Sequence, residues 1–329
     1  MASRPSNIGV NAPEFPANLS WLNSKPLSLK KLKGQVVLID FWTYSCVNCL
    51  RTLSHVQKWH KTYAEKGLVI IGVHTPEFAF ESDARNVRQA VDDLGIGYPV
   101  VLDAKYEVWN LYANHWWPRK LLIDKSGKVV YDHIGEGDYA KTEEVIQRTL
   151  VAAGAKRMPK IAPDDGTTNG DVCLPITPET YLGYERGRYL NPNVDARQKK
   201  TYRDGRRARD DRPVLEGTWK VMGEYAESFG GSLRLPYMAG EVNVVMDPGT
   251  HDAVEVEVWR NGEPVPHAAA GDDVSFMQRA SVVHVDAPRM YRLMNAPTHE
   301  EGVLELRVGE GARLYAFTFG GGCYSHFTV

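Results

Sequence analysis

The sequence has too little cysteine for a fold held together by disulfides. Only four cysteines occur in 329 residues, whereas disulfide scaffolds are short and dense in cysteine. The sequence also lacks any uninterrupted apolar run close to the ~20 residues of a membrane span. Its formal net charge of −2 gives no electrostatic reason to expect a nucleic-acid partner. The remaining composition is ordinary for a globular chain, and the length favours two domains.

The first residues also show none of the features of an N-terminal leader. Segment 1–7 is polar and lacks an apolar h-region, so we expect no signal peptide. The chain is then either cytosolic or a mature or truncated piece of an exported protein, and the cysteine count alone does not decide between these.

Two of the four cysteines, Cys46 and Cys49, form the most informative motif of the chain. They follow an apolar, β-branched run at 36–42 that predicts a buried strand. Apolar residues at steps of three and four up to Gly67 predict a helix directly after them. At such a junction, the unpaired N–H groups and the positive end of the helix dipole stabilise a thiolate on Cys46. A thiolate beside a second thiol is a dithiol/disulfide switch.

The alternatives for an isolated CxxC motif are a zinc half-site, a structural disulfide and a c-type haem attachment. Zinc would require a second pair at similar spacing, but Cys173 and Cys323 are solitary. Haem attachment requires a histidine after the second cysteine, where Leu50 stands. The strand–helix context favours the redox interpretation, and the pairing of the two solitary cysteines stays open.

The next elements predict an α/β domain over 1–155. Hydrophobic periodicity and turn residues predict strands at 68–73, 98–103, 120–124 and 128–131, and helices at 84–94 and 143–153. This order gives a parallel core with an antiparallel hairpin at its edge, which is the thioredoxin layout.

The composition then changes. Segment 156–215 is rich in Pro, Gly, Asp and Arg and predicts a linker, of which 177–184 is apolar enough to pack on a domain. From 216 to 329 the apolar period becomes two, with six strand candidates separated by turn signals. This pattern predicts an all-β sandwich of the jelly-roll kind.

Three further positions are candidates for the site. Asp40 lies inside the first buried strand, where burial would raise the pKa of its carboxyl; the alternative is a solvated carboxylate at the strand end. Glu77 follows the second strand, and loops after parallel strands share one rim, so it is a second acid for tuning the dithiol. Trp117-Pro118 precedes a strand and is a candidate cis bond that presents the Trp117 backbone to an extended substrate; a trans proline in a surface turn is the alternative.

These residues carry a specific resemblance. Segment 40–49 resembles the thioredoxin pattern Asp-Phe-Trp-x-x-x-Cys-x-x-Cys; it reads Asp-Phe-Trp-Thr-Tyr-Ser-Cys-Val-Asn-Cys. Asp40 stands at the position of that family's buried acid. Segments 72–77, 98–103 and 117–130 are similar to the membrane-tethered TlpA/ResA branch, in which a glutamate adjusts the acidity of the cysteines and the proline is cis. With Thr-Pro-Glu-Thr-Tyr-Leu-Gly at 177–183 and the β-rich tail, nearly the whole chain resembles the C-terminal, extracytoplasmic part of DipZ-type proteins.

The resemblance implies a thiol–disulfide oxidoreductase that acts on disulfide-bearing proteins of the cell envelope. In the DipZ family a CcdA-like membrane domain precedes this part and supplies electrons, and the β-domain is likened to a carbohydrate-binding module. The chain would then be a soluble fragment of a protein tethered outside the cytoplasm, with carbohydrate as a further candidate ligand. Ser45 stands where thioredoxins usually have Trp, and Val47-Asn48 replaces their dipeptide. Whether the protein acts as a reductant or as an oxidant of its partners therefore stays open.

The expected mechanism is disulfide exchange without a metal or organic cofactor. Cys46 attacks the partner's disulfide, and Cys49, deprotonated with help from Asp40 or Glu77, resolves the mixed disulfide. One rival is a peroxidase, since Thr43-x-x-Cys46 matches half of a peroxiredoxin signature, although Ile39 stands where that signature has Pro.

The other rival is a carbohydrate- or protein-binding module with an accessory redox domain. In that case aromatic residues of the β-domain would stack on sugar rings, and the candidates are Trp219, Tyr225, Tyr237, Trp259 and Tyr291.

Overall fold

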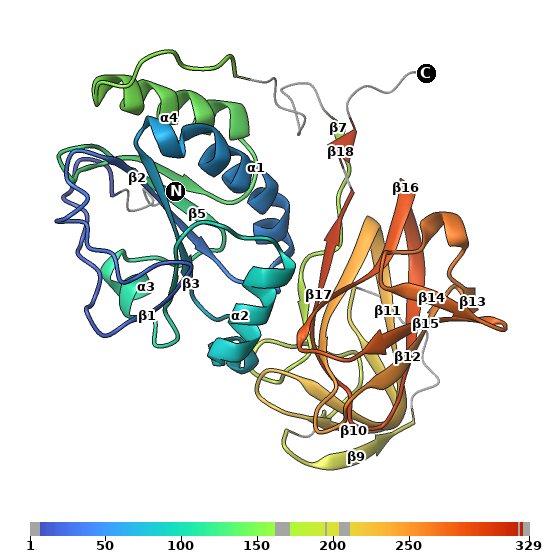
Figure 1. The fold of residues 1–329 in the computed structure, drawn as a ribbon. Helices are drawn as coiled ribbons and strands as arrows, with labels where there is room; N and C mark the ends of the chain where they lie inside the picture. Colours follow the sequence, from blue (N-terminus) through green and yellow to red (C-terminus); the bar gives the residue numbers. More distant parts are fainter. Residues whose placement is uncertain (1–6, 162–171, 195, 204–210, 322, 325–329) are drawn as a thin grey trace. The chain divides into compact units, whose positions relative to one another are not determined.

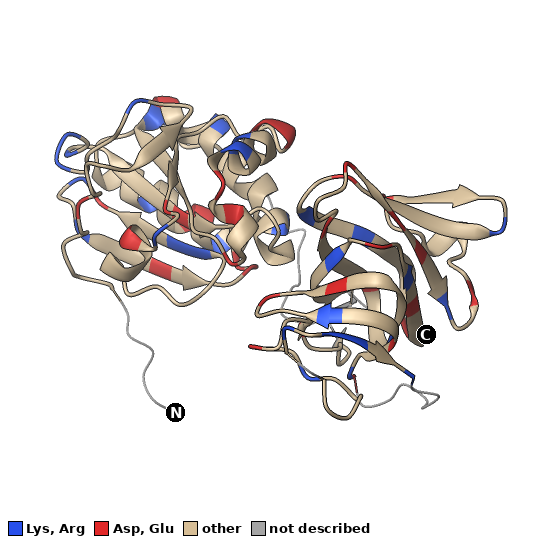
Figure 2. Ribbon diagram, turned by 90° about the horizontal axis from the view of Figure 1, so that it is seen from below, with Lys and Arg blue, Asp and Glu red and all other residues tan. Residues whose placement is uncertain are grey.

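The chain folds into two compact units, Met1–Thr168 and Asn169–Val329, in the computed structural model (Figure 1). The structure describes all residues except 1–6, 162–171, 195, 204–210, 322 and 325–329. Figure 2 shows basic and acidic residues interspersed along both units.

The first unit is an α/β sheet, as the sequence predicts. Its sheet has the order β1-β4-β3-β2-β5-β6, with β2, β3 and β4 parallel and the remaining pairs antiparallel. Its strands are β1 (Ser20–Leu22), β2 (Val36–Trp42), β3 (Leu68–His74), β4 (Val100–Leu102), β5 (Arg119–Ile123) and β6 (Val129–Ile134). Its helices are α1 (Val47–Tyr63), η1 (Ala64–Lys66), η2 (Ala79–Ser82), α2 (Ala84–Asp93), α3 (Glu107–Leu111) and α4 (Tyr139–Ala152).

Each face of this sheet has its own apolar core. On one face, alternate residues of β2 such as Leu38 and Trp42 pack with Leu53 of α1, Val91 of α2 and Ile146 of α4. On the other face, the intervening β2 residues pack with α3 and the N-terminal segment. Because side chains alternate along a strand, Asp40 lies on the same face as Leu38 and Trp42. This register directs Asp40 toward the face that α1 covers.

The second unit is all-β, as predicted. Its main sheet has ten antiparallel strands along the path β14-β15-β12-β16-β11-β10-β9, with β13, β17 and β8 attached to that path. The strands are β8 (Thr180–Tyr181), β9 (Lys199–Tyr202), β10 (Val214–Val221), β11 (Ala226–Asp247), β12 (Val254–Arg260), β13 (Glu263–Pro264), β14 (Val274–Met277), β15 (Ala280–Val285), β16 (Arg289–Val308) and β17 (Arg313–Gly320); η3 (His267–Ala269) is a short helix. Strands β7 (Val172–Cys173) and β18 (Cys323–Tyr324) pair separately.

Two long strands organise this unit. β11 pairs with β16 along most of its length, and register shifts occur after Ala239 and Val242. The first part of β11 pairs with β10 and the last part with β17, yet residues of both parts, Leu235 and Met246 among them, share one apolar core. Two of the separate strand candidates are therefore parts of one bent strand. β8 and β9 lie in the segment predicted as a linker and belong to the main sheet.

Candidate active site

The two site cysteines begin helix α1. Cys46 is its N-cap residue, with φ −82° and ψ 114°, and its Sγ accepts a hydrogen bond from the Cys49 backbone N–H at 3.3 Å. Both cysteines are free thiols; Cys46 is half-buried, whereas Cys49 is 3% exposed. The helix N-terminus supplies an N–H donor and a positive field to the Cys46 sulfur, which is the arrangement that stabilises a thiolate.

Cys49 has the opposite environment. Burial raises the pKa of its thiol, as do the hydrogen bond to Cys46 and the charges of Cys46 and Asp40, and a backbone hydrogen bond from Thr43 only partly opposes this. Cys49 therefore stays protonated unless a nearby base takes its proton. The two thiols differ in the way that a nucleophile and a resolving cysteine require.

Asp40 is a buried acid next to this pair. It is 2% exposed, and burial raises the pKa of its carboxyl from 3.8 to about 6, although the positive charge of Lys120 lowers it. Among the described residues, its Oδ1 has no hydrogen-bond donor. A carboxyl with this pKa exchanges a proton near neutral pH.

Lys120 is a site residue that the sequence reasoning missed. It lies directly opposite Asp40 in the β2–β5 ladder and is fully buried, with its Nζ donating to the Gly135 carbonyl at 3.1 Å. Burial lowers the pKa of its ammonium, while the negative charges of Asp40, Cys49 and Glu136 oppose this. Period-two counting from Leu122 puts Lys120 on the α1 face of the sheet, a signal that was available in the sequence.

The second buried acid is Glu81 rather than Glu77. Glu77 is half-buried and gives its backbone N–H to Glu81 Oε2 at 2.5 Å. Glu81 is 1% exposed, and its Oε1 accepts from the backbone N–H and the hydroxyl of Ser45 at 3.2 and 2.7 Å. Burial raises the pKa of Glu81 despite these hydrogen bonds and one from Thr43. Glu77 lies in the loop after β3 and Glu81 in the one-turn helix η2, which is too short to show a helical period in the sequence.

His74 and Thr43 form a buried contact behind the cysteine turn. The His74 ring stacks on Tyr44 at 5.5 Å and its Nε2 lies 3.4 Å from Thr43 Oγ1. Burial lowers the pKa of His74 to about 3, so its ring is neutral at physiological pH. The Thr43 hydroxyl is engaged with His74 and Glu81, and the peroxidase signature would instead need it on the Cys46 sulfur.

Trp117 and Pro118 directly precede β5, and the bond between them is cis. The Trp117 indole N–H donates to the Thr75 carbonyl at 3.0 Å, in the loop after β3, and the ring packs on Trp109 with centroids 4.2 Å apart. Trp117 is half-buried and Pro118 is buried. This hydrogen bond links the segment before Pro118 to the loop between β3 and η2.

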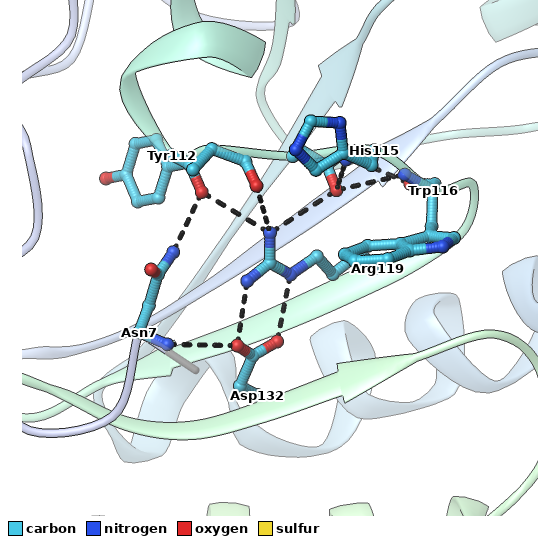
Figure 3. A network of polar contacts seen from close by, with 8 residues as sticks. Asn7, Tyr112, His115, Trp116, Arg119 and Asp132 are labelled. Atoms are coloured by element: carbon cyan, nitrogen blue, oxygen red, sulfur yellow. Dashed lines mark hydrogen bonds and ion pairs between the residues drawn. The ribbon is translucent and has the colours of Figure 1, made fainter. Parts of the chain in front are cut away.

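One buried guanidinium holds the loop that leads into Trp117 (Figure 3). Arg119 forms two hydrogen bonds with Asp132, at 2.9 and 2.7 Å, and both side chains are almost completely buried. It also donates to the carbonyls of Tyr112 and Ala113 and to Asn114 Oδ1. This oxygen in turn accepts from the N–H groups of the next two residues. The network fixes the backbone before the proline.

The β unit places its candidate residues differently from the prediction. Trp219, Tyr237 and Tyr291 are core residues at 1% exposure or less, so they cannot stack on a sugar. Tyr225 and Trp259 are half-buried, and arginine guanidinium groups lie 5.0 and 4.1 Å from their ring centroids.

The remaining cysteines lie in this unit. Cys173 is disulfide-bonded, and its backbone pairs with that of Cys323 in the β7–β18 ladder.

Across the described ranges, no helix is long and apolar enough to cross a membrane. The same residues contain no group of three or more His, Cys, Asp or Glu side chains that could hold a metal ion.

Comparisons with known proteins agree with both units. Residues 8–148 match the Redoxin family, and residues 177–320 match a family described as the thioredoxin-like C-terminal domain. Protein DipZ of Mycobacterium tuberculosis is 35% identical over 323 residues, which are 94% of this chain and 43% of DipZ. The chain thus spans less than half the length of that relative.

Shorter matches cover the first unit. Thiol-disulfide oxidoreductase ResA of Bacillus anthracis is 33% identical over 141 residues, covering 43% of this chain and 78% of ResA. Protein SUPPRESSOR OF QUENCHING 1 of Arabidopsis thaliana is 36% identical over 150 residues, covering 45% of this chain and 14% of that protein. With its CxxC motif at the start of α1, the chain belongs to the thioredoxin-like thiol–disulfide oxidoreductases of the ResA and DipZ type.

Proposed function

We propose that this chain is a reductant of disulfides in exported or cell-envelope proteins, with Cys46 as nucleophile and Cys49 as resolving thiol. The observation that carries the proposal is the asymmetry of the pair. Cys46 is accessible at a helix N-terminus with an N–H on its sulfur, and Cys49 is buried with a raised pKa.

In the first step the Cys46 thiolate attacks one sulfur of the partner's disulfide. A new bond forms between Cys46 Sγ and that sulfur, the partner's S–S bond breaks, and the other sulfur leaves as a thiolate. The leaving thiolate takes a proton from the solvent. The Cys49 N–H donates to the attacking sulfur at the helix N-terminus, where the helix dipole favours negative charge.

In the second step Asp40 acts as the base for Cys49. Its carboxylate takes the Cys49 proton, the new thiolate attacks Cys46 Sγ, and the mixed disulfide breaks to release the reduced partner and the Cys46–Cys49 disulfide. This role is supported by the burial of Asp40, by its Oδ1, to which no described residue donates, and by its pKa of about 6. Glu77, the other acid predicted from the sequence, remains a proposed contributor through its loop.

The substrate would lie along the Trp117–Pro118 segment. An extended peptide adding to the Trp117 backbone as a strand would bring its disulfide to Cys46. The hydrogen bond from Trp117 to Thr75 and the Arg119 network support a backbone that is already ordered along this segment before a substrate binds.

The Cys46–Cys49 disulfide must be reduced again after each turnover. The DipZ resemblance assigns this step to a CcdA-like membrane domain, which would also tether the full-length protein outside the cytoplasm. For the β unit we propose an accessory binding role, with Tyr225 and Trp259 as the remaining sugar-stacking candidates because both are half-buried.

Insulin reduction by the full chain, with dithiothreitol as the terminal reductant, tests the function. We expect the chain to accelerate insulin precipitation and not to consume hydrogen peroxide stoichiometrically. Peroxide consumption with rapid formation of a sulfenic acid on Cys46, and no insulin reduction, would contradict the proposal and favour the peroxidase.

A further inference from the structure

The most heavily hydrogen-bonded acid of the site has no part in the exchange steps above. Glu81 is 1% exposed and receives donors from two separate loops. Its Oε1 takes the N–H and hydroxyl of Ser45, and its Oε2 takes the N–H groups of Glu77 and Phe78 at 2.5 and 3.0 Å.

We propose that Glu81 is a positioning residue for Cys46, a role that rests on the proposed exchange function. Its carboxylate locks the turn before Cys46 to the loop after β3. It thereby holds the nucleophilic sulfur where the Cys49 N–H reaches it.

The position of Ser45 supports this role. Ser45 directly precedes Cys46 and is itself 2% exposed, so its N–H and hydroxyl have no solvent to replace Glu81. Hydrogen bonds to a carboxylate are about twice as strong as bonds between neutral groups. Two of them on one residue fix the backbone that enters the N-cap, and the direction of the Cys46 side chain follows from that backbone.

The same loop also reaches the proposed substrate segment. Thr75, six residues before Glu81, accepts the indole N–H of Trp117, and Pro76 accepts the hydroxyl of Tyr106 at 2.6 Å. Glu81 therefore connects the nucleophile to the loop on which the substrate segment is anchored. A change at Glu81 should alter the placement of the sulfur relative to an incoming disulfide.

The test compares Glu81→Gln with Glu65→Gln, a charge-matched control at an exposed glutamate on η1. The readouts are the alkylation rate of Cys46 by iodoacetamide at pH 7 and the equilibrium potential of the Cys46/Cys49 pair against glutathione. We expect Glu81→Gln to slow alkylation about 10-fold, because an amide cannot accept all of the donors and the sulfur loses its fixed place. We also expect a measurably changed potential and no change in the control.

Ser45→Ala is the milder variant, for use if Glu81→Gln does not fold. It removes the hydroxyl bond and keeps the N–H bond, so alkylation should slow by a smaller factor, about 3-fold. Unchanged alkylation and potential in folded Glu81→Gln would overturn the proposal, as would a larger effect from Glu77→Gln than from Glu81→Gln. If instead the wild-type chain reduces no insulin, the exchange function itself fails, and that outcome is distinct from these.

Discussion

The two units of the chain bury polar side chains in different ways. The first unit buries Asp40 and Lys120 under α1, where Asp40 Oδ1 has no donor among the described residues and burial shifts the pKa of both groups. The second unit buries Asp247, but there the carboxylate accepts from the Tyr315 hydroxyl at 2.6 Å and from the Gly249 N–H. Its other buried polar residues are mostly neutral, such as Asn191.

This difference distinguishes buried groups that stabilise the fold from buried groups that can take part in proton transfer. A buried ionisable group with satisfied partners stabilises a fold, whereas one with a shifted pKa and an open lone pair is poised to exchange a proton. The first unit contains both kinds, since the buried Arg119–Asp132 pair shares two hydrogen bonds and adjoins the proposed substrate segment. Asp40 combines a raised pKa with a carboxylate oxygen that has no donor among the described residues, and it lies beside the thiols.

The largest expected effect comes from the thiols themselves. Cys46→Ser should abolish insulin reduction, because no other described thiol lies at a helix N-terminus, whereas Cys49→Ser should accumulate mixed disulfides with partner proteins. Mass spectrometry after brief iodoacetamide treatment should show label on Cys46 before Cys49, since only Cys46 is accessible. Preferential labelling of Cys49 would reverse the assigned roles.

Asp40→Asn should have the next largest effect. Resolution of the mixed disulfide should slow by about 10- to 100-fold, while its formation changes less, because the carboxylate is the proposed base for Cys49. In the wild type, the rate at which Cys49 resolves the mixed disulfide should fall as pH drops below about 6, because Asp40 becomes protonated there. Stopped-flow measurement of both steps between pH 5 and 8 checks this, and equal slowing of the two steps would argue against a base at this position.

The same variant should make the protein more stable at neutral pH. The pKa of Asp40 is raised from 3.8 to about 6 in the folded state, so its favourable contribution is complete below pH 3.8 and is lost as pH rises through 6. Across this pH range the raised pKa lowers the free energy of unfolding by about 3 kcal/mol. Chemical denaturation should therefore show Asp40→Asn gaining stability over the wild type at pH 8 and little at pH 4. A gain at pH 4 alone would contradict this assignment.

Lys120→Met should also slow resolution of the mixed disulfide, but by less than Asp40→Asn does. The ammonium lowers the pKa of Asp40 by its charge, so its removal should move the acid limb of the resolution rate to higher pH. At pH 7 the rate should fall about 3- to 10-fold because less Asp40 is ionised. Lys128→Met, at an exposed lysine before β6, is the matched control. An unshifted pH profile in Lys120→Met would leave the lysine with a packing role only.

Much of the first unit was predictable from its sequence, because its strands are apolar runs and its sheet order follows from the βαβ pattern. Asp40 was found because a charge stands out in such a run. Lys120 was missed because a lysine in a strand is usually solvated, whereas this one shares the α1 face of the sheet with Leu122. Glu81 was missed because the single turn of η2 is too short for a hydrophobic period to show that its glutamate points inward.

The second unit was less predictable for a physical reason. Short alternating runs indicate strands, but they do not show that 233–235 and 241–246 are parts of one long strand bent at its bulges. Alternation also does not separate a buried aromatic from an exposed one when both faces of a strand are partly covered. Trp219 and Trp259 look alike in sequence, yet the first is completely buried and the second is half-buried.

The smallest effect on activity should come from a buried polar residue of the second unit. The Asn191 side chain donates to the Leu215 carbonyl at 2.9 Å and accepts from the Leu215 N–H at 2.7 Å. Asn191→Ala leaves both backbone groups buried without a partner and should cost about 2 kcal/mol or more of stability. Because Asn191 belongs to the β unit, we expect insulin reduction and the Cys46/Cys49 potential to stay at the wild-type values while the β unit melts at a lower temperature. Calorimetry together with the insulin assay checks this. A loss of exchange activity below the melting transition would mean that polar burial in the second unit also serves the chemistry, and the contrast between the two units would not hold.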